Sequence, residues 1–245
     1  MGKADLHIHT RYSDGLATFE EVVQWANDRT DLDVIAITDH EDVEGALRAR
    51  ELAAKRGYRV EVVVGAEVTT LQGHLLALFI EERPPLLRSV EHTLAWIHAR
   101  GGVAVIPHPM SWLTRSLGRR AIERICERRE EGVTFDAIEL ANPSPAGRPG
   151  RAEAIRLNQE RWHLPATGSS DAHHLLHIGR GWTTFPGRRA EELREALLAG
   201  TIGYGMEPYP SAREVGYGNL VLGVAYGFTA TPRKAARRAW ERLRR

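Results

Sequence analysis

The chain has 245 residues, of which 42% are hydrophobic and 27% charged, and its formal net charge is +1 at pH 7. This composition is typical of a folded globular protein. The near balance of charge excludes proteins that bind nucleic acid or membranes through a strong overall charge. The balance is uneven along the chain, because residues 231–245 hold seven Lys or Arg and a single Glu. They predict a solvated helical end, with a phosphate-rich partner as the alternative.

The single cysteine and the short apolar runs bear on where the protein resides. Cys126 has no partner for an internal disulfide, which is typical of a reducing compartment, and we interpret it as a structural residue. The first ten residues lack the apolar core that a secretory signal needs. The apolar run 220–228 is too short to span a bilayer. We therefore expect a cytoplasmic protein with no membrane contact.

Short apolar runs alternate with longer amphipathic ones along the chain. Several of the short runs are rich in Val and Ile without polar alternation, which is typical of parallel strands buried on both faces. The predicted strands are 4–9, 33–38, 60–65, 74–80, 102–107, 135–140 and 164–170. Helical patterns separate most of them, the first with a capping-box spacing from Thr18 to Glu21. The predicted helices are 18–29, 43–57, 89–102, 151–162 and 189–200.

The repeated strand–helix order predicts an α/β fold with a parallel sheet. About seven strands in one stretch of chain favour a single TIM-like (β/α)7 barrel over two domains, so we expect one domain over residues 1–245. The Pro- and Gly-rich stretch 142–151 predicts a loop over one end of the barrel. Residues 207–245 are expected to form an irregular wrap that leads into a basic C-terminal helix.

Histidines and carboxylates gather where these strands end, at the edge where barrels of this type carry their active sites. His7 and His9 are two apart on a strand and therefore point to one face. A dense cluster of buried imidazoles and carboxylates would be unsatisfied without an ion. Such ligands suit Zn²⁺, Mn²⁺ or Fe²⁺, and their number requires two or three ions. The cluster comprises His7, His9, Asp14, His40, Glu67, His74, His108, Asp171 and His173.

The order of these motifs resembles that of the PHP (polymerase and histidinol phosphatase) family of metal-dependent phosphoesterases. The resemblance runs over roughly residues 4–200 and rests on DLHIHTRYSDG, ITDHEDVEGALRA, GAEV, GHLLALF, IPHP and TGSSDAHHLLHIGRGWT. It implies a distorted seven-stranded barrel with a trinuclear metal centre at the C-terminal strand ends. It also implies three sites: His7, His9, Glu67 and Asp171; Glu67, His74 and His108; and Asp14, His40 and His173.

The resemblance also bears on the branch of the family. Many histidinol-phosphate phosphatases of the family have a histidine where this chain has Asp14. The segment TDH followed by DVEGALRA resembles the branch that acts on nucleotides and short oligoribonucleotides. Those relatives usually insert a small lid domain between the fourth and fifth strands, and this chain leaves no room for one. The missing lid implies a more open pocket and a different or broader substrate.

We expect hydrolysis of a phosphomonoester or phosphodiester by a hydroxide that bridges the ions, without a covalent intermediate. Glu67, Asp171 and His173 would act through the metal centre, and Asp39 would hydrogen-bond to a ligand from behind. A small phosphorylated substrate is the expected partner, and no stable nucleic-acid complex is expected. Candidate substrate contacts are Arg115, Arg119, Arg120, Asn142, Arg148 and Arg151, each of which a surface or packing role would also explain. His174 and His177 could move protons or pack.

Three alternatives remain at this point. A histidinol-phosphate-type small-molecule phosphatase would use the same ligands. A non-catalytic metal-binding regulatory module would also retain the barrel, although an intact ligand set argues against it. An amidohydrolase would share the H-x-H strand, but such enzymes usually have a bridging lysine after a middle strand. The three lysines, Lys3, Lys55 and Lys234, do not occupy such a position.

Overall fold

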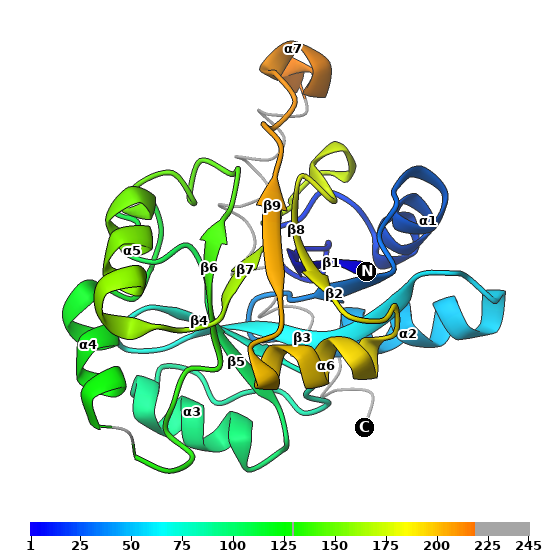
Figure 1. Ribbon diagram of the computed structural model, residues 1–245. Helices are drawn as coiled ribbons and strands as arrows, with labels where there is room; N and C mark the ends of the chain where they lie inside the picture. Colours follow the sequence, from blue (N-terminus) through cyan, green and yellow to red (C-terminus); the bar gives the residue numbers. More distant parts are fainter. Residues whose placement is uncertain (129, 219–245) are drawn as a thin grey trace.

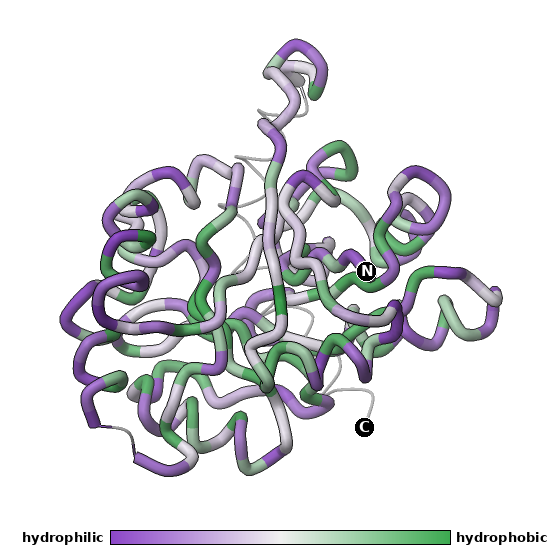
Figure 2. Tube along the Cα trace, in the orientation of Figure 1, coloured by the Kyte–Doolittle hydropathy of each residue, from purple (hydrophilic) through white to green (hydrophobic). Residues whose placement is uncertain are grey.

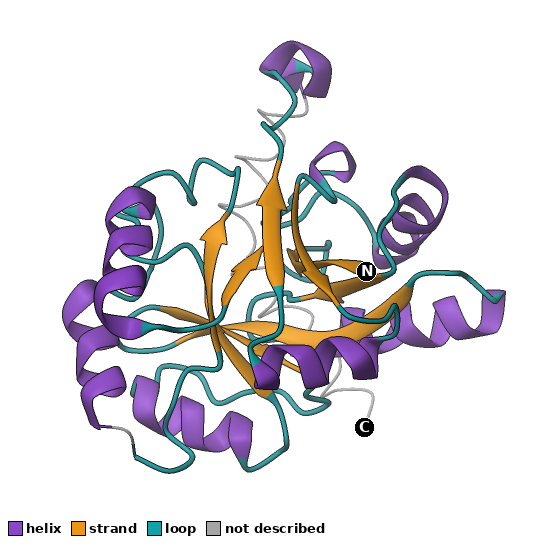
Figure 3. Cartoon of the chain, viewed as in Figure 1, coloured by secondary structure: helices purple, strands orange, loops and turns teal. Residues whose placement is uncertain are grey.

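The structure is a computed structural model that describes residues 1–128 and 130–218 (Figures 1 and 3). Within these residues, nine strands alternate with helices along most of the sequence. The strands are β1 (Gly2–Ile8), β2 (Val34–Ile37), β3 (Glu61–Thr69), β4 (His74–Leu78), β5 (Val103–Ile106), β6 (Ala137–Ala141), β7 (Ala166–Gly168), β8 (Gly181–Phe185) and β9 (Gly203–Met206). The α-helices are α1 (Phe19–Arg29), α2 (Glu44–Arg56), α3 (Val90–His98), α4 (Arg119–Arg128), α5 (Arg151–Leu157), α6 (Ala190–Ala199) and α7 (Ala212–Val215).

The strands form one sheet in the order β7-β6-β5-β4-β3-β2-β1-β8-β9, which curls into a nearly closed barrel. At one end of this order β7 lies against β8 and β9 of the other end, and Gly168 N–H donates to Thr183 Oγ1 at 3.1 Å. Gly168 permits this approach, because a Cβ there would lie 2.5 Å from the Trp182 carbonyl oxygen. The expected α/β barrel is confirmed, and all seven predicted strands are present. Strands β8 and β9 were not predicted.

The expectation of a wholly parallel sheet was wrong at β4. This strand runs antiparallel to both β3 and β5. The reason is the connection from β3 to β4, residues 70–73, which is long enough for a hairpin but too short for the crossover that parallel strands require. Because β4 is reversed, its first residue, His74, lies at the edge where the parallel strands end.

Two further differences concern helices. Helix α4 was not predicted, because its sequence is dense in Arg and Glu and buries only Ile122 and Ile125. The predicted helix 151–162 is α-helical in α5 and continues as a π-helical turn over Asn158–Trp162. Within the segment 207–245, which was expected to begin as an irregular wrap, Ala212–Val215 form the short helix α7. The expected basic C-terminal helix lies outside the described residues.

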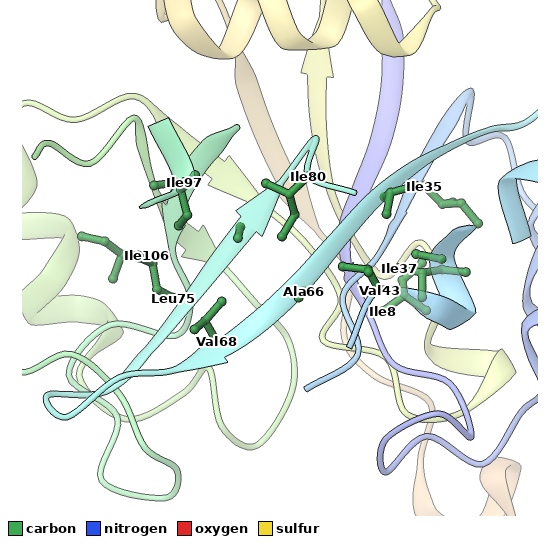
Figure 4. Close-up of a cluster of buried hydrophobic side chains, with 14 of the residues drawn as sticks. Ile8, Ile35, Ile37, Val43, Ala66, Val68, Leu75, Ile80, Ile97 and Ile106 are labelled. Carbon is green, nitrogen blue, oxygen red and sulfur yellow. The ribbon is translucent and has the colours of Figure 1, made fainter. Parts of the chain in front are cut away.

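Two buried apolar clusters hold the barrel together. The larger one packs side chains of the strands against α1 to α5, as the isoleucines of Figure 4 illustrate. The smaller one joins strand residues such as Leu6 and Val105 to Leu193 and Leu197 of α6. The outer helices alternate hydrophilic and hydrophobic residues, as expected of helices with one buried face (Figure 2). Within residues 1–128 and 130–218, no helix is both long enough and apolar enough to cross a membrane.

Candidate metal centre

The fold brings the nine expected ligands to one edge of the barrel. His7 and His9 lie at the end of β1, His40 follows β2, and His108 follows β5, while Glu67 and His74 belong to the β3–β4 hairpin. Six of the nine are at most 6% exposed: His7, His9, Glu67, His74, His108 and Asp171. Asp14, His40 and His173 are partly exposed and form the more open side of the cluster. Burial of this many ionisable groups requires that they satisfy one another or bind ions.

Glu67 is the centre of the cluster, because five imidazoles surround its carboxylate. Oε2 lies 3.3 Å from Nε2 of both His7 and His9, and 3.4 Å from His40 Nδ1. Oε1 lies 2.7 Å from His74 Nδ1 and 3.0 Å from His108 Nε2. Burial alone would raise the pKa of Glu67, but the surrounding histidines, His74 foremost, lower it well below its ordinary value. Glu67 is therefore an anion with histidine nitrogens on both of its oxygens.

The hairpin register explains the shortest of these contacts. Glu67 pairs with Leu76, and Thr69 pairs with His74. Since side chains two apart on a strand share a face, Glu67 and His74 are diagonal neighbours on one face of the hairpin. The four-residue connection fixes this register. A spacing of seven residues in sequence therefore becomes a direct contact.

Two aspartates complete the cluster. Asp14 lies 3.4 Å from His9 Nδ1, 3.5 Å from His40 Nε2 and 3.2 Å from His173 Nε2. Asp171 approaches His7 at 3.5 Å and His9 at 3.6 Å. Burial opposes ionisation of both carboxyls, yet the adjacent histidines lower their pKa values below the ordinary range. Three ionised carboxylates thus face six imidazoles.

The distances do not assign each ligand to a single site. Ligand atoms within 4.8 Å of one another form five overlapping triads, and His40 joins Asp14 in one and Glu67 in another. No triad found among the described residues contains Glu67, His74 and His108 together. The triads are His7–His108–Asp171, His7–His9–Glu67, His9–Asp171–His173, His9–Asp14–His40 and His40–Glu67–His74. The three-site division implied by the family resemblance therefore stays a prediction.

Unsatisfied atoms test whether these residues fit divalent ions. His9 Nε2, Asp14 Oδ1 and His74 Nδ1 are buried, and none has a hydrogen-bond partner of suitable geometry among the described residues. His74 Nδ1 is only 2.7 Å from Glu67 Oε1, yet the angle between the two groups does not suit a hydrogen bond. Nitrogen and oxygen donors that converge in this way suit Zn²⁺, Mn²⁺ or Fe²⁺. The residues present fit the expected ions.

A buried glutamate that the sequence analysis missed supports the ligands from behind. Glu139 lies near the end of β6, with Oε1 3.2 Å from His7 Nδ1 and hydrogen-bonded to Ser169. Its Oε2 accepts from the His108 amide and from Asn142 Nδ2, both at 2.7 Å. Such a contact to Nδ1 orients an imidazole so that Nε2 faces the ion. The clue in the sequence was a carboxylate at a strand end, as at Glu67.

Asp39 and Asn142 take supporting positions. The Asp39 carboxylate accepts from Thr10 N at 2.8 Å and from Ser13 Oγ at 2.5 Å. Ser13 Oγ is in turn 3.3 Å from His9 Nδ1, so Asp39 reaches a ligand through one hydroxyl. Both amide atoms of Asn142 are hydrogen-bonded within the protein, to Glu139 and to the Ser144 amide. This arrangement disfavours the expected contact of Asn142 with substrate.

The arginines expected to contact substrate differ in their exposure and in whether they already form ion pairs within the protein. Arg119 pairs with Glu123 at 2.9 Å along α4. Arg115 and Arg120 are exposed in the segment after His108. Arg148 and Arg151 line a cavity of about 230 Å³ together with Pro143 and with residues of 206–208. Ser144, which follows Pro143 in the chain, donates from its hydroxyl to Asp171 Oδ2 at 2.9 Å.

The charges of the metal-free cluster predict a dependence of stability on pH. Burial disfavours protonation of His9, but the carboxylates, Asp14 first, raise its pKa to about 10. A raised histidine pKa stabilises the fold fully below the unfolded value of 6.5, and this contribution is lost as the pH rises towards 10. The lowered pKa of Glu67 contributes fully above its unfolded value of 4.5. Between these two values both contributions are present.

We therefore expect the free energy of unfolding of chelator-treated protein to fall from pH 6.5 to pH 10. Urea denaturation at intervals across this range measures it. Added Zn²⁺ or Mn²⁺ should stabilise the protein more at pH 8 than at pH 6, because the ions displace protons from the imidazoles. A free energy that stays constant from pH 6.5 to pH 10 would contradict the expectation.

Comparisons with known proteins agree with this geometry. The family model of the PHP domain matches residues 5–160, and a model of a PHP-associated region matches residues 153–202. An uncharacterized protein of Methanocaldococcus jannaschii is 34% identical over 174 residues, which are 66% of this chain and 94% of that protein. A 3',5'-nucleoside bisphosphate phosphatase of Chromobacterium violaceum is 36% identical over 91 residues, 36% of this chain and 31% of the phosphatase.

A solved structure shows the same fold. It is a two-domain protein of Bacteroides vulgatus that contains a predicted PHP-like metal-dependent phosphoesterase. The TM-score is 0.67 at 22% identity, and the match covers 84% of this chain and 64% of that one. The barrel described above is therefore shared with that protein, while the two chains differ at most positions.

Proposed function

Because the chain belongs to the PHP domain family of metal-dependent phosphoesterases, we propose that it hydrolyses a phosphomonoester or phosphodiester of a nucleotide or short oligonucleotide. The observation that carries the proposal is the Glu67 carboxylate with five imidazole nitrogens within 3.4 Å. A likeness to the nucleoside bisphosphate phosphatase of Chromobacterium violaceum supports a nucleotide substrate. Two or three divalent ions and a cytoplasmic location belong to the same proposal.

The roles of the protein groups follow from their positions. Divalent ions bound here would act as Lewis acids on a phosphoryl group and would lower the pKa of a coordinated water. Glu67, Asp14 and Asp171 have lowered pKa values, and as carboxylates they would hold the ions. His7 is oriented by Glu139, so that its Nε2 faces Glu67. Arg148, exposed at the cavity that Pro143 and Arg151 also line, would bind a phosphate oxygen of the substrate.

A substrate panel tests the proposed reaction. Purified protein loaded with Zn²⁺, Mn²⁺ or Fe²⁺ should release phosphate from nucleotides or cleave bis-p-nitrophenyl phosphate, and should lose this activity on chelation. Histidinol phosphate and an amide panel serve as comparison substrates. Hydrolysis of amides without hydrolysis of any phosphate ester would refute the proposal. Hydrolysis of histidinol phosphate in strong preference to nucleotides would refute the substrate class alone.

An exposed tryptophan gives a sharper prediction about the substrate. Trp112 is 80% exposed and lies in the loop between His108 and Ser116, whose hydroxyl is 2.8 Å from His108 Nδ1. Stacking of a nucleobase on an aromatic side chain contributes about 1–3 kcal/mol. We expect Trp112→Ala to raise KM for AMP about tenfold, and Trp112→Phe to change it little. The KM for ribose 5-phosphate, which lacks the base, should be the same in Trp112→Ala as in the wild type.

Steady-state kinetics of both substrates with both variants measures this effect. Trp25, on α1, supplies the matched control, because it is partly buried against the core and its loss should lower stability without separating the two substrates. If Trp112→Ala raised KM equally for AMP and for ribose 5-phosphate, Trp112 would not contact the base.

A further inference from the structure

The segment that follows β9 makes hydrogen bonds and ring contacts with residues 170–180, which include Asp171 and His173 of the metal centre. Glu207 N–H donates to the Arg180 carbonyl oxygen at 2.7 Å, and the Glu207 carboxylate pairs with the Arg180 guanidinium at 2.8 Å. Two residues later, the Tyr209 ring stacks on the His177 ring, with centroids 4.0 Å apart and planes 15° apart. Burial lowers the pKa of His177 to about 4, so the stacked imidazole is neutral. Residues 207–209 are thus fixed on the chain that runs from Asp171 to Arg180.

The Tyr209 hydroxyl extends this attachment to the metal centre itself. It donates to the carbonyl oxygens of Ser170 and of Asp171, the latter at 3.0 Å. Because a phenol has one proton, the two carbonyls share it. The phenol is the donor in both contacts, because a carbonyl oxygen can only accept. A side chain from the end of the described chain therefore contacts the backbone of a metal-centre residue.

The backbone at Asp171 needs such a contact. Its φ is +55°, in the left-handed region that non-glycine residues rarely adopt. A conformation of this kind is unfavourable and persists only where surrounding groups fix it. On one side, Asp5 accepts from Ser170 N at 2.9 Å and from Ser170 Oγ at 2.5 Å. On the other side, the two carbonyls are held by Tyr209.

We propose that Tyr209 is a positioning residue that holds the Ser170–Asp171 backbone so that the Asp171 carboxylate faces His7 and His9. The proposal rests on the proposed metal centre. It assigns to the segment after β9 a role in metal binding, in which the hydroxyl fixes the peptide and His177 fixes the ring. Removal of the hydroxyl would release the strained peptide and would weaken the binding of an ion by the Asp171 carboxylate.

The test compares Tyr209→Phe, which keeps the stacked ring, with Tyr204→Phe, the same change at an exposed position of β9. Titration of metal-free protein with Zn²⁺ by calorimetry gives affinity and stoichiometry without reference to activity. Loss of groups that orient a ligand typically lowers metal affinity about 10- to 100-fold. We expect Tyr209→Phe to lose Zn²⁺ affinity by this factor at one ion, and Tyr204→Phe to keep the wild-type affinity. The metal-free proteins should have nearly equal melting temperatures.

A double-mutant cycle separates positioning from general stabilisation. If Tyr209 acts through Asp171, Tyr209→Phe should have little further effect on Zn²⁺ affinity in an Asp171→Asn background. The same loss in both backgrounds would overturn the proposal, as would wild-type Zn²⁺ affinity in Tyr209→Phe. Failure of the wild-type protein to bind any divalent ion is a different result, because it removes the proposed metal centre itself.

Discussion

Replacement of Glu67 by glutamine is expected to lower kcat for phosphate ester hydrolysis by at least about 10³-fold, since metal ions supply several kcal/mol of transition-state stabilisation. The change keeps the shape of the side chain but removes the charge that faces five imidazoles. It should also reduce the number of bound ions, because this carboxylate is the group closest to most ligands. Metal analysis by mass spectrometry and kinetics on one protein preparation measure both effects.

Glu61→Gln is the matched control. Glu61 begins the same strand, six residues earlier, and its carboxylate accepts from the Ala190 amide at 2.7 Å, away from the cluster. We expect this variant to retain metal content and kcat. A Glu67→Gln protein with the wild-type number of ions and undiminished kcat would show that the carboxylate is not part of the reaction centre.

Replacement of Glu139 by alanine is expected to be the most destabilising of the substitutions considered. It would leave the buried His108 amide, the Asn142 side chain and His7 Nδ1 without their acceptor. Removal of one partner from a buried charged network typically costs about 3–5 kcal/mol. For a protein of this size we expect the melting temperature to fall by about 10 °C.

Thermal denaturation followed by circular dichroism measures the change, with Glu195→Ala on the exposed side of α6 as the control. Glu139→Gln keeps an acceptor for the His108 amide, so it should recover much of the lost stability while metal affinity stays reduced. A melting temperature for Glu139→Ala within about 2 °C of wild type would mean that the network contributes little to folding.

The sequence predicted those features that depend on local pattern. Val- and Ile-rich runs mark several of the strands β1 to β7, because strands buried on both faces need not alternate polar and apolar residues. His7 and His9 were recognisable because their spacing on a strand fixes their common direction. The clustering of ligands followed from the rule that parallel strands end at one edge.

Features that depend on distant contacts were not predictable in this way. The reversed direction of β4 follows from a connection whose shortness was visible but not interpreted. Glu139 stands at the end of a predicted strand, but its contact with His7 depends on the fold. Tyr209 lies 38 residues beyond Asp171 in the chain, and nothing in its local sequence connects the two. Helix α4 was missed because few apolar residues mark its buried face.

The four-residue turn between β3 and β4 makes the ligand set sensitive to chain length. Insertion or deletion of one residue in 70–73 would shift the pairing of Thr69 with His74 by one position. Since alternate residues of a strand face opposite ways, such a shift would turn the histidine away from Glu67 while the apolar residues of β4 could still be buried. Both faces of β4 are buried, so its hydrophobicity does not specify the register. The length of this turn is therefore part of the metal-binding motif, as much as the identities of the glutamate and the histidine.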